Sequence, residues 1–187
     1  MSTIKDKNLA TIGQQEVDWA ARQMKVLEEI KTEFSSSKPL NGLNIGACMH
    51  VTKETANLML TLKAAGANVA LCASNPLSTK DSVAAYLSEN DIEVHAVHGV
   101  SNEDFFKHLN SVLDTNPDIT MDDGADLVTL LLTDRADIPI MGSMEETTTG
   151  VIRLKSMEKN NKLRFPVVAV NDSETKHLFD NRFGTGQ

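Results

Sequence analysis

The chain has 187 residues, of which 41% are hydrophobic and 24% charged, enough for the buried core of one domain of ordinary size. Its formal net charge of −8 argues against a nucleic-acid-binding protein, which needs a basic surface to neutralise phosphates. No apolar run reaches the ~18–20 residues that span a bilayer, and the polar residues 1–7 lead into no apolar signal segment. We therefore expect a cytoplasmic protein that binds neither nucleic acid nor a membrane.

The first predicted element is a helix over residues 14–34, where apolar side chains recur at helical spacing with one exception, at Lys31. The segment Ser35 to Pro39 is predicted to end this helix, because proline restricts the residue before it and donates no backbone hydrogen bond. We expect residues 1–38 to form a helical segment that packs on the domain that follows.

From residue 43 onward, short apolar runs alternate with longer amphipathic stretches. The predicted strands cover residues 43–49, 69–73, 93–97, 119–121, 138–141 and 167–170. The predicted helices cover residues 54–65, 79–89, 102–113, 126–132, 146–159 and 173–179. This alternation is typical of a parallel sheet, and continuous apolar runs indicate strands that are covered on both faces. We predict an α/β, three-layer Rossmann-like domain over residues 39–181, with a mainly parallel sheet and helices on both faces.

Polar side chains follow the ends of these predicted strands. In open parallel α/β sheets, ligands bind beyond the carboxyl ends of the strands. The polar sets fall at residues 50–54, 74–75, 122–126, 145–150 and 171–172. Acids, an imidazole and hydroxyls are therefore expected to converge on one edge of the sheet.

Several of these residues also have a structural explanation. A lone histidine such as His50 is more often structural than catalytic. Thr52 could cap the next helix, with Glu54 in its first turn. Thr147, Thr148 and Thr149 are harder to explain in this way, because β-branched residues are poor helix starters. That exception suggests that the three hydroxyls hold a ligand.

Lys176 and Asp180 lie four residues apart on a predicted helix and so share a face. They could form a surface ion pair, but lysine before aspartate is the weaker order for such a pair, which slightly favours another role.

The sequence gives little sign of a metal site. Cys48 and Cys72 sit in apolar runs outside any Cys-x-x-Cys pair, so we expect two buried thiols and no zinc. The run Asp122 to Gly124 lacks the alternating acids and the terminal glutamate of an EF-hand loop. We therefore expect no bound metal.

Taken together, the polar loops resemble the adenosylhomocysteinase (S-adenosylhomocysteine hydrolase) family in order and spacing. The matching segments are residues 48–56 (CMHVTKETA), 74–79 (SNPLST), 122–126 (DDGAD), 145–150 (EETTTG), 170–176 (VNDSETK) and 179–187 (FDNRFGTGQ). The resemblance implies reversible cleavage of S-adenosylhomocysteine into adenosine and homocysteine. In that family, tightly bound NAD oxidises the ribose 3′-hydroxyl, homocysteine is eliminated, water adds and the hydride returns.

The resemblance also implies roles for individual residues. Lys176 and Asp180 would serve the 3′-hydroxyl, with the substrate-binding Asn181 beside them. His50 and Asp123 would act as acid and base near the 5′ carbon, where an imidazole readily exchanges protons. The ligand contacts that remain would come from Glu146 on the ribose hydroxyls, Thr52 and Glu54 on the adenine edge, and Thr147, Thr148 and Thr149 toward the NAD cofactor.

Glu54 bears on the choice of substrate. A carboxylate only accepts hydrogen bonds, which suits the amino group of adenine better than the carbonyl of hypoxanthine. S-inosylhomocysteine, used by related archaeal enzymes, is therefore the less favoured substrate. A non-catalytic nucleoside-binding or regulatory module is a further alternative, against which the four acid/base residues speak.

Three residues depart from the family pattern. Lys80 stands where glutamine is usual, Met144 where a small hydroxyl residue is usual, and Thr185 where many members have cysteine. None belongs to the implied acid/base set.

No Gly-x-Gly-x-x-Gly fingerprint of a dinucleotide-binding domain occurs in the sequence. We expect residues 182–187 to begin the connection to an NAD-binding domain that this chain lacks. The chain alone is therefore expected to be inactive until a C-terminal NAD-binding portion or a second polypeptide completes it. The resemblance also implies a homo-oligomer.

Overall fold

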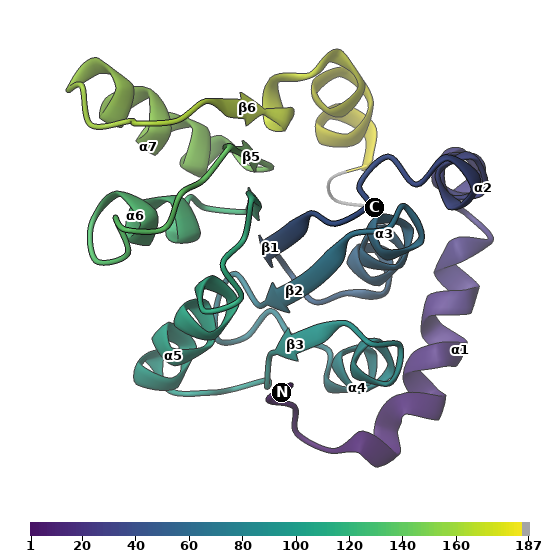
Figure 1. Ribbon diagram of the computed structural model, residues 1–187. Coiled ribbons are helices and arrows are strands. Elements are labelled where there is room, and N and C mark those ends of the chain that lie inside the picture. The colour runs from purple at the N-terminus through teal and green to yellow at the C-terminus, as the bar shows by residue number, and fades with distance from the viewer. Residues whose placement is uncertain (185–187) are drawn as a thin grey trace.

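Six parallel strands form one sheet within residues 1–184, which are the residues that the computed structural model describes. The side chains of residues 179–181, 183 and 184 lie outside this description. The strand order is β3-β2-β1-β4-β5-β6, visible from bottom to top in Figure 1. The strands are β1 (Asn44–Cys48), β2 (Asn68–Cys72), β3 (Glu93–His95), β4 (Ile119–Asp122), β5 (Gly142–Glu145) and β6 (Val167–Ala169). The predicted α/β fold with a parallel sheet is confirmed.

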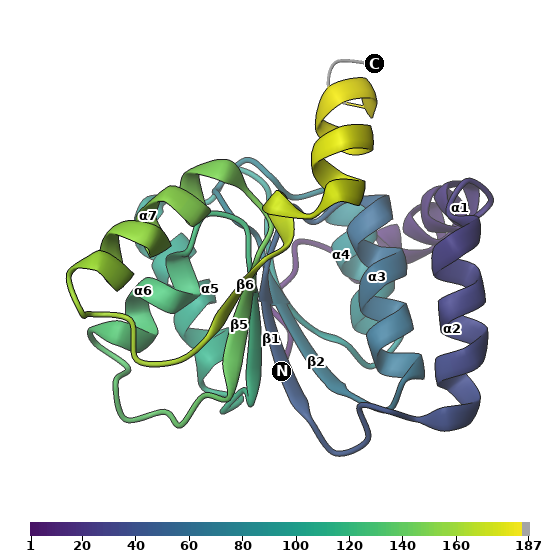
Figure 2. The same cartoon turned by 90° about the horizontal axis from the view of Figure 1, so that it is seen from above.

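Helices cover both faces of the sheet (Figure 2). On one face lie α3 (Lys53–Ala64) and α4 (Asp81–Glu89), and the opposite face carries α5 (Asn102–Leu113), α6 (Asp126–Leu132) and α7 (Thr148–Lys159). Outside α3 and α4, two N-terminal helices add a further layer, α1 (Ala10–Ala21) and α2 (Lys25–Ser37). Short 3₁₀ turns fall at η1 (Lys7–Leu9) and η2 (Val170–Asp172), and the final helix η3 (Thr175–Gly184) projects beyond the sheet in Figure 2.

The prediction of a single helix over residues 14–34 is wrong. The backbone leaves the helical conformation at Met24, with φ −103° and ψ 55°, and the chain turns from α1 into α2. Packing accompanies this break, because α1 lies against both α4 and α3, whereas α2 lies against α3. At Gly13, a Cβ atom would come within 2.0 Å of the carbonyl oxygen of Ser82, so the approach of α1 to α4 requires glycine.

The predicted strand at residues 138–141 is also wrong, because the strand in that region is β5, four residues further on. Pro139 interrupts the apolar run and cannot donate a ladder hydrogen bond. The side chains that β5 buries are polar, namely those of Ser143 and Glu145. An apolar pattern therefore points to the wrong segment here.

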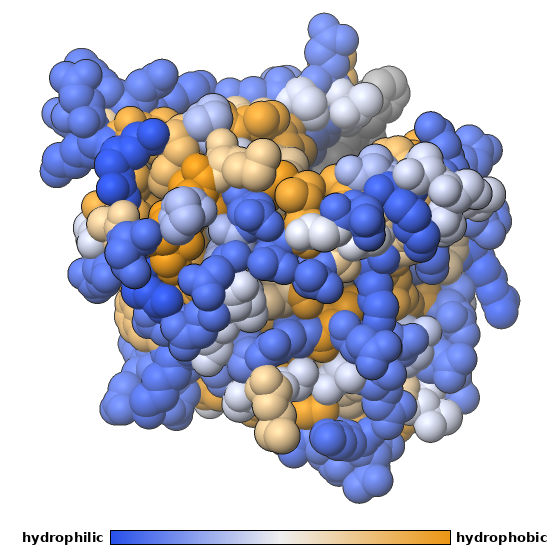
Figure 3. Space-filling model, in the orientation of Figure 1, coloured by the Kyte–Doolittle hydropathy of each residue, from blue (hydrophilic) through white to orange (hydrophobic). Residues whose placement is uncertain are grey.

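The core lies in two large clusters, one on each face of the sheet. Leu71 and Val94 belong to the cluster under α3 and α4. Cys48 and Cys72 belong to the cluster under α5 and α6, where both thiols are free and buried, as expected. On the face seen in Figure 3, apolar side chains appear in patches between hydrophilic ones. Among the described residues, no helix has the length and apolar character that crossing a membrane requires.

The strand order fixes where a ligand site is expected. Strands β2 and β3 extend the sheet on one side of β1, and the chain then crosses to the other side of β1 to form β4. The loops after β1 and β4 therefore diverge and leave a crevice at the carboxyl edge, which is the common binding position in doubly wound sheets.

Candidate functional site at the carboxyl edge of the sheet

His50 and Asp123 meet at the crevice between β1 and β4. His50 follows β1, Asp123 follows β4, and His50 Nε2 lies 3.1 Å from Asp123 Oδ2. The Ser74 hydroxyl donates to the same carboxylate oxygen over 3.2 Å. The His50 side chain is 55% exposed, so its ring is open to a ligand. A carboxylate that orients an exposed imidazole is suited to proton exchange.

Lys176 lies at the centre of a second group, beside the end of β5. Its Nζ donates to the main-chain oxygen of Glu146 and, over 3.1 Å, to Asn171 Oδ1. Glu146 Oε1 lies 3.4 Å from the same Nζ, and Thr148 Oγ1 donates to Asn171 Oδ1 over 3.3 Å. The Lys176 side chain is only 15% exposed. We call these four residues the Lys176 cluster; its partly buried cation could stabilise an oxyanion.

Two of the predicted site residues lie on the final helix, η3. Asp180 and Asn181 belong to η3, but their side chains lie outside the described residues. Thr185 lies outside them altogether. Their family roles therefore stay predictions.

Thr52 and Glu54 lie at the start of α3. Thr52 caps the helix, since its hydroxyl accepts from the Thr55 backbone N–H over 3.3 Å, and the capping interpretation is confirmed. Glu54 lies in the first turn, half exposed, and lines two cavities, one shared with His50 and one shared with Glu146. Glu54 therefore lies beside both groups.

Thr147, Thr148 and Thr149 open α7. Thr147 is the N-cap residue, and its extended backbone (φ −121°, ψ 151°) removes it from the helix proper. Thr148 and Thr149 occupy the first turn and are exposed. Their hydroxyls therefore lie at a helix N-terminus beside the Lys176 cluster.

Glu145 is a buried carboxylate that the sequence reasoning gave no role. It accepts hydrogen bonds from the backbone N–H groups of Gly124 (3.0 Å), Ala125 (2.9 Å) and Thr147 (2.9 Å). Burial raises the pKa of Glu145, and these hydrogen bonds oppose the rise. Glu145 thereby ties the loop that carries Asp123 to the loop that carries Glu146.

Asp122 is a second buried carboxylate without a predicted role. Its oxygens accept from the backbone N–H groups of Leu127 (3.2 Å) and Val128 (2.9 Å) at the start of α6. Burial raises the pKa of Asp122 to about 7, although those two hydrogen bonds lower it. The inward alternation of these short strands, one acid in and the next out, is the signal that could have identified both residues.

The raised pKa of Asp122 predicts how stability depends on pH. Between pH 4 and 7 the folded protein keeps a proton that the unfolded chain loses, so the free energy of unfolding falls as pH rises. We expect Asp122 to contribute a fall of about 3 kcal/mol between about pH 5 and pH 8. Urea unfolding of the wild type and of Asp122→Asn at both pH values measures it. If the free energy of unfolding changed with pH by the same amount in both proteins, this assignment would be contradicted.

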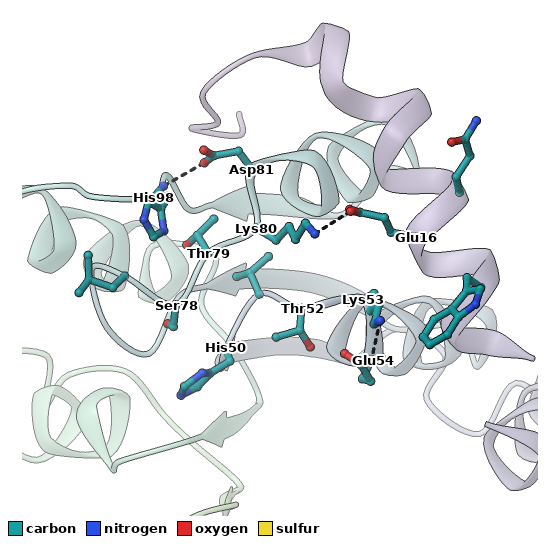
Figure 4. Close-up of a pocket in the computed structure, with 14 residues that line it drawn as sticks. Glu16, His50, Thr52, Lys53, Glu54, Ser78, Thr79, Lys80, Asp81 and His98 are labelled. Atoms are coloured by element: carbon teal, nitrogen blue, oxygen red, sulfur yellow. Dashed lines mark hydrogen bonds and ion pairs between the residues drawn. The ribbon is translucent and has the colours of Figure 1, made fainter. Parts of the chain in front are cut away.

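A cavity of about 860 Å³ opens beside His50, between α1, the loop from β1 to α3 and the loop from β2 to α4. Figure 4 shows Lys80 and Glu16 reaching toward each other across it. The sequence reasoning did not assign Glu16, because its place in the wall depends on how α1 packs. Among the described residues, no group of three or more His, Cys, Asp or Glu side chains could hold a metal ion.

Comparisons with known proteins agree on one family. The family model described as S-adenosyl-L-homocysteine hydrolase matches residues 1–141 and 135–183. An adenosylhomocysteinase of Pyrococcus abyssi is 51% identical over 186 residues, which cover 98% of this chain and 44% of the relative. An S-inosyl-L-homocysteine hydrolase of Methanococcus maripaludis is 52% identical over 189 residues, which cover 100% of this chain and 46% of the relative. An adenosylhomocysteinase of Aquifex aeolicus is 52% identical over 187 residues, which cover 98% of this chain and 45% of the relative. The chain thus spans less than half the length of these relatives.

Proposed function

The chain belongs to the S-adenosyl-L-homocysteine hydrolase family, and from this premise we propose that it forms the substrate-binding portion of an adenosylhomocysteinase. The proposed reaction is the reversible hydrolysis of S-adenosyl-L-homocysteine to adenosine and L-homocysteine. The observation that carries the proposal is the presence of two polar groups, His50 with Asp123 and the Lys176 cluster, on one edge of the sheet. The substrate-binding domain would comprise residues 39–181, with residues 1–38 packed on it and a cytoplasmic location.

Lys176 would act at the ribose 3′-hydroxyl. A cation that is mostly buried and held by Asn171 favours an alkoxide over a hydroxyl at an oxygen placed beside it. Glu146, 3.4 Å from the ammonium group, would accept hydrogen bonds from the ribose hydroxyls. Asp180 and Asn181 would complete this side of the ribose.

His50 and Asp123 would act at the 5′ carbon. The exposed imidazole, oriented by the carboxylate 3.1 Å away, would give a proton to the departing sulfur and take one from the incoming water. Thr52 and Glu54, at the start of α3, would contact the adenine edge.

NAD is the cofactor of the proposed activity, and it would supply the oxidation at the ribose 3′ position. Thr148 and Thr149 fit a contact with its polar nicotinamide end, because their hydroxyls are exposed at a helix N-terminus. Thr148 also bonds to the Lys176 cluster. We propose that residues 147–149 contact NAD, and that a C-terminal portion or a second polypeptide binds the rest of the dinucleotide.

Complementation tests the proposed function. The chain is mixed with NAD⁺ and the remaining C-terminal part of the Pyrococcus abyssi relative, and thiol release from S-adenosyl-L-homocysteine is measured. We expect homocysteine release in the mixture. Adenosine binding without release under any such complementation would instead support a non-catalytic nucleoside-binding module.

S-inosyl-L-homocysteine is a second candidate substrate, because a hydrolase named for it is as similar to this chain as the adenosylhomocysteinases are. Glu54 favours the adenosyl compound, since its carboxylate accepts from the adenine amino group and repels the hypoxanthine carbonyl. We expect wild-type chain to bind adenosine about tenfold more tightly than inosine. In Glu54→Gln, whose side-chain amide also donates, the ratio of adenosine affinity to inosine affinity should fall to near one.

Calorimetric titration of both nucleosides measures the preference. The control is Glu103→Gln, which changes an exposed glutamate of α5 that pairs with Lys107. It should keep the wild-type ratio. An inosine preference in the wild type would assign the inosyl substrate instead.

A further inference from the structure

We propose that the outer edge of β6 binds a second copy of this chain, with the two β6 strands antiparallel and related by a twofold axis at Val168. The pairing would join the two sheets into one continuous sheet. The strand residues that make this edge belong to neither polar group of the proposed nucleoside site, so the inference does not depend on the function proposed above.

The two edges of the sheet are covered unequally. Beside β3, the Thr3 N–H donates to the Val94 carbonyl oxygen over 2.8 Å, and the Ala96 N–H donates to the Thr3 carbonyl oxygen over 3.0 Å. The N-terminus thus covers the β3 edge, beside which it lies in Figure 1. At the opposite edge, β6 pairs with β5 alone among the strands that residues 1–184 form. An edge strand without such cover offers unpaired backbone groups to another chain.

The pairing of β6 with β5 determines which backbone groups of β6 face outward. The Ser143 N–H of β5 donates to the Pro166 carbonyl oxygen over 3.0 Å. Backbone groups of alternate residues face the same side of a strand, so Val168, like Pro166, faces β5. Val167 and Ala169 therefore present their N–H and C=O groups to the open side. The missing N–H of Pro166 does not interrupt this outer edge, because it would face β5.

An antiparallel copy of β6 meets these outward groups in a suitable register. With the axis at Val168, Val167 of one copy lies opposite Ala169 of the other, and the two residues can exchange both of their hydrogen bonds. The same pairing recurs on the other side of the axis, because a twofold contact uses the same surface on both copies.

Val168 gives this contact an apolar centre. Its side chain is 61% exposed and in register with Met144 on β5, which is in register with Met121 on β4. Met121 packs against the core cluster under α3 and α4, but these helices contact β2 and β3, at the other end of the sheet. At the axis the two Val168 side chains would lie side by side and continue the apolar row across the contact.

The charges that flank β6 favour an antiparallel second copy as the partner. Two exposed basic residues, Lys162 and Arg164, precede the strand, and two exposed acidic residues, Asp172 and Glu174, follow it. Antiparallel pairing places the basic end of each strand beside the acidic end of the other, whereas a parallel arrangement would align like charges. Because Asp172 is paired with Lys155 on α7, most of this attraction would fall to Glu174. The contact is self-complementary, as an interface between identical chains requires.

Concentration-dependent association tests the proposal. Sedimentation equilibrium of the wild-type chain should show monomer and dimer in exchange, with a dissociation constant of about 10 μM, as suits a small interface. Val168→Lys places two ammonium groups together at the axis and should weaken the dimer at least about tenfold. Val26→Lys is the matched control, because Val26 is a 72% exposed valine of α2, and it should keep the wild-type dissociation constant.

Amide hydrogen exchange assigns the surface. The Val167 and Ala169 amides of the wild type should exchange at least about tenfold more slowly in concentrated than in dilute solution. The same amides of Val168→Lys should show no such slowing. Equal urea midpoints for Val168→Lys and Val26→Lys would show that the first variant loses the contact and not the fold.

Three results would overturn the proposal. The first is a monomer at every concentration, and the second is a dimer that Val168→Lys leaves unchanged. The third is protection of the two amides only after the C-terminal part of the Pyrococcus abyssi relative is added, because the edge would then bind that part and not a second copy. Homocysteine release in the complementation assay tests the proposed function separately from all three.

Discussion

Replacing Lys176 by methionine is expected to lower homocysteine release in the complemented mixture by about a hundred- to a thousandfold. Methionine keeps much of the apolar stem but removes the ammonium group that bonds to Asn171 and lies 3.4 Å from Glu146. A 3′-oxyanion would then face the Glu146 carboxylate without a cation between them. Initial rates at saturating S-adenosyl-L-homocysteine measure the loss.

The control for this variant is Lys155→Met. Lys155 is an exposed lysine of α7 that pairs with Asp172 at 3.1 Å, and its loss should leave the rate within about twofold of wild type. Adenosine binding should weaken far less than the rate in Lys176→Met, because the charge acts on the developing oxyanion. Equal rates for the two variants would remove Lys176 from the proposed chemistry.

Replacing Glu145 by alanine is expected to lower the free energy of unfolding by about 3 kcal/mol, because it leaves buried N–H donors unpaired. Three backbone donors, those of Gly124, Ala125 and Thr147, bond to this carboxylate. The fit is tight, since a Cβ atom on Gly150 would come within 2.2 Å of the carboxyl carbon. The variant should also lose adenosine affinity, as the loops after β4 and β5 come apart.

Glu146→Ala separates the structural role from the ligand role. Glu146 is the next residue along the chain, but its side chain is partly exposed and its carboxylate pairs with Lys176. We expect this variant to lose adenosine affinity while its free energy of unfolding changes by less than about 1 kcal/mol. Urea unfolding of both variants measures the difference, and equal stability would show that Glu145 is not the tie between the loops.

Much of the fold was predictable because local signals agree with the packing. The bounds of α5 and α6 match the prediction, and Ser101 caps α5 by accepting from the Asp104 backbone N–H, as a helix start requires. Gly66 directly follows the predicted helix over residues 54–65, and its positive φ of 99° is the conformation that favours glycine at a helix end. The helix error occurs where the decisive contacts are distant in sequence, since α1 packs on α4 and α3 and α2 packs on α3.

The site was predictable to the extent that strand ends determine it. Residues that follow parallel strands share an edge, so the meeting of His50 and Asp123 follows from the strand pattern once β1 and β4 are neighbours. Glu145 and Asp122 were given no role because each stands next to a second acid at a strand end, and only the alternation along the strand distinguishes the buried acid from the exposed one. Glu16 was given no role because it reaches Lys80 from α1, in another layer of the fold.

A crystal structure of the chain with adenosine tests the central claim most directly, since it reports which groups the nucleoside meets. We expect the ribose 3′ oxygen within hydrogen-bond distance of Lys176 Nζ, the 5′ carbon beside His50 and the adenine edge at Glu54. A nucleoside bound away from His50 and Lys176, or with its 5′ carbon turned toward Lys176, would contradict the proposed site.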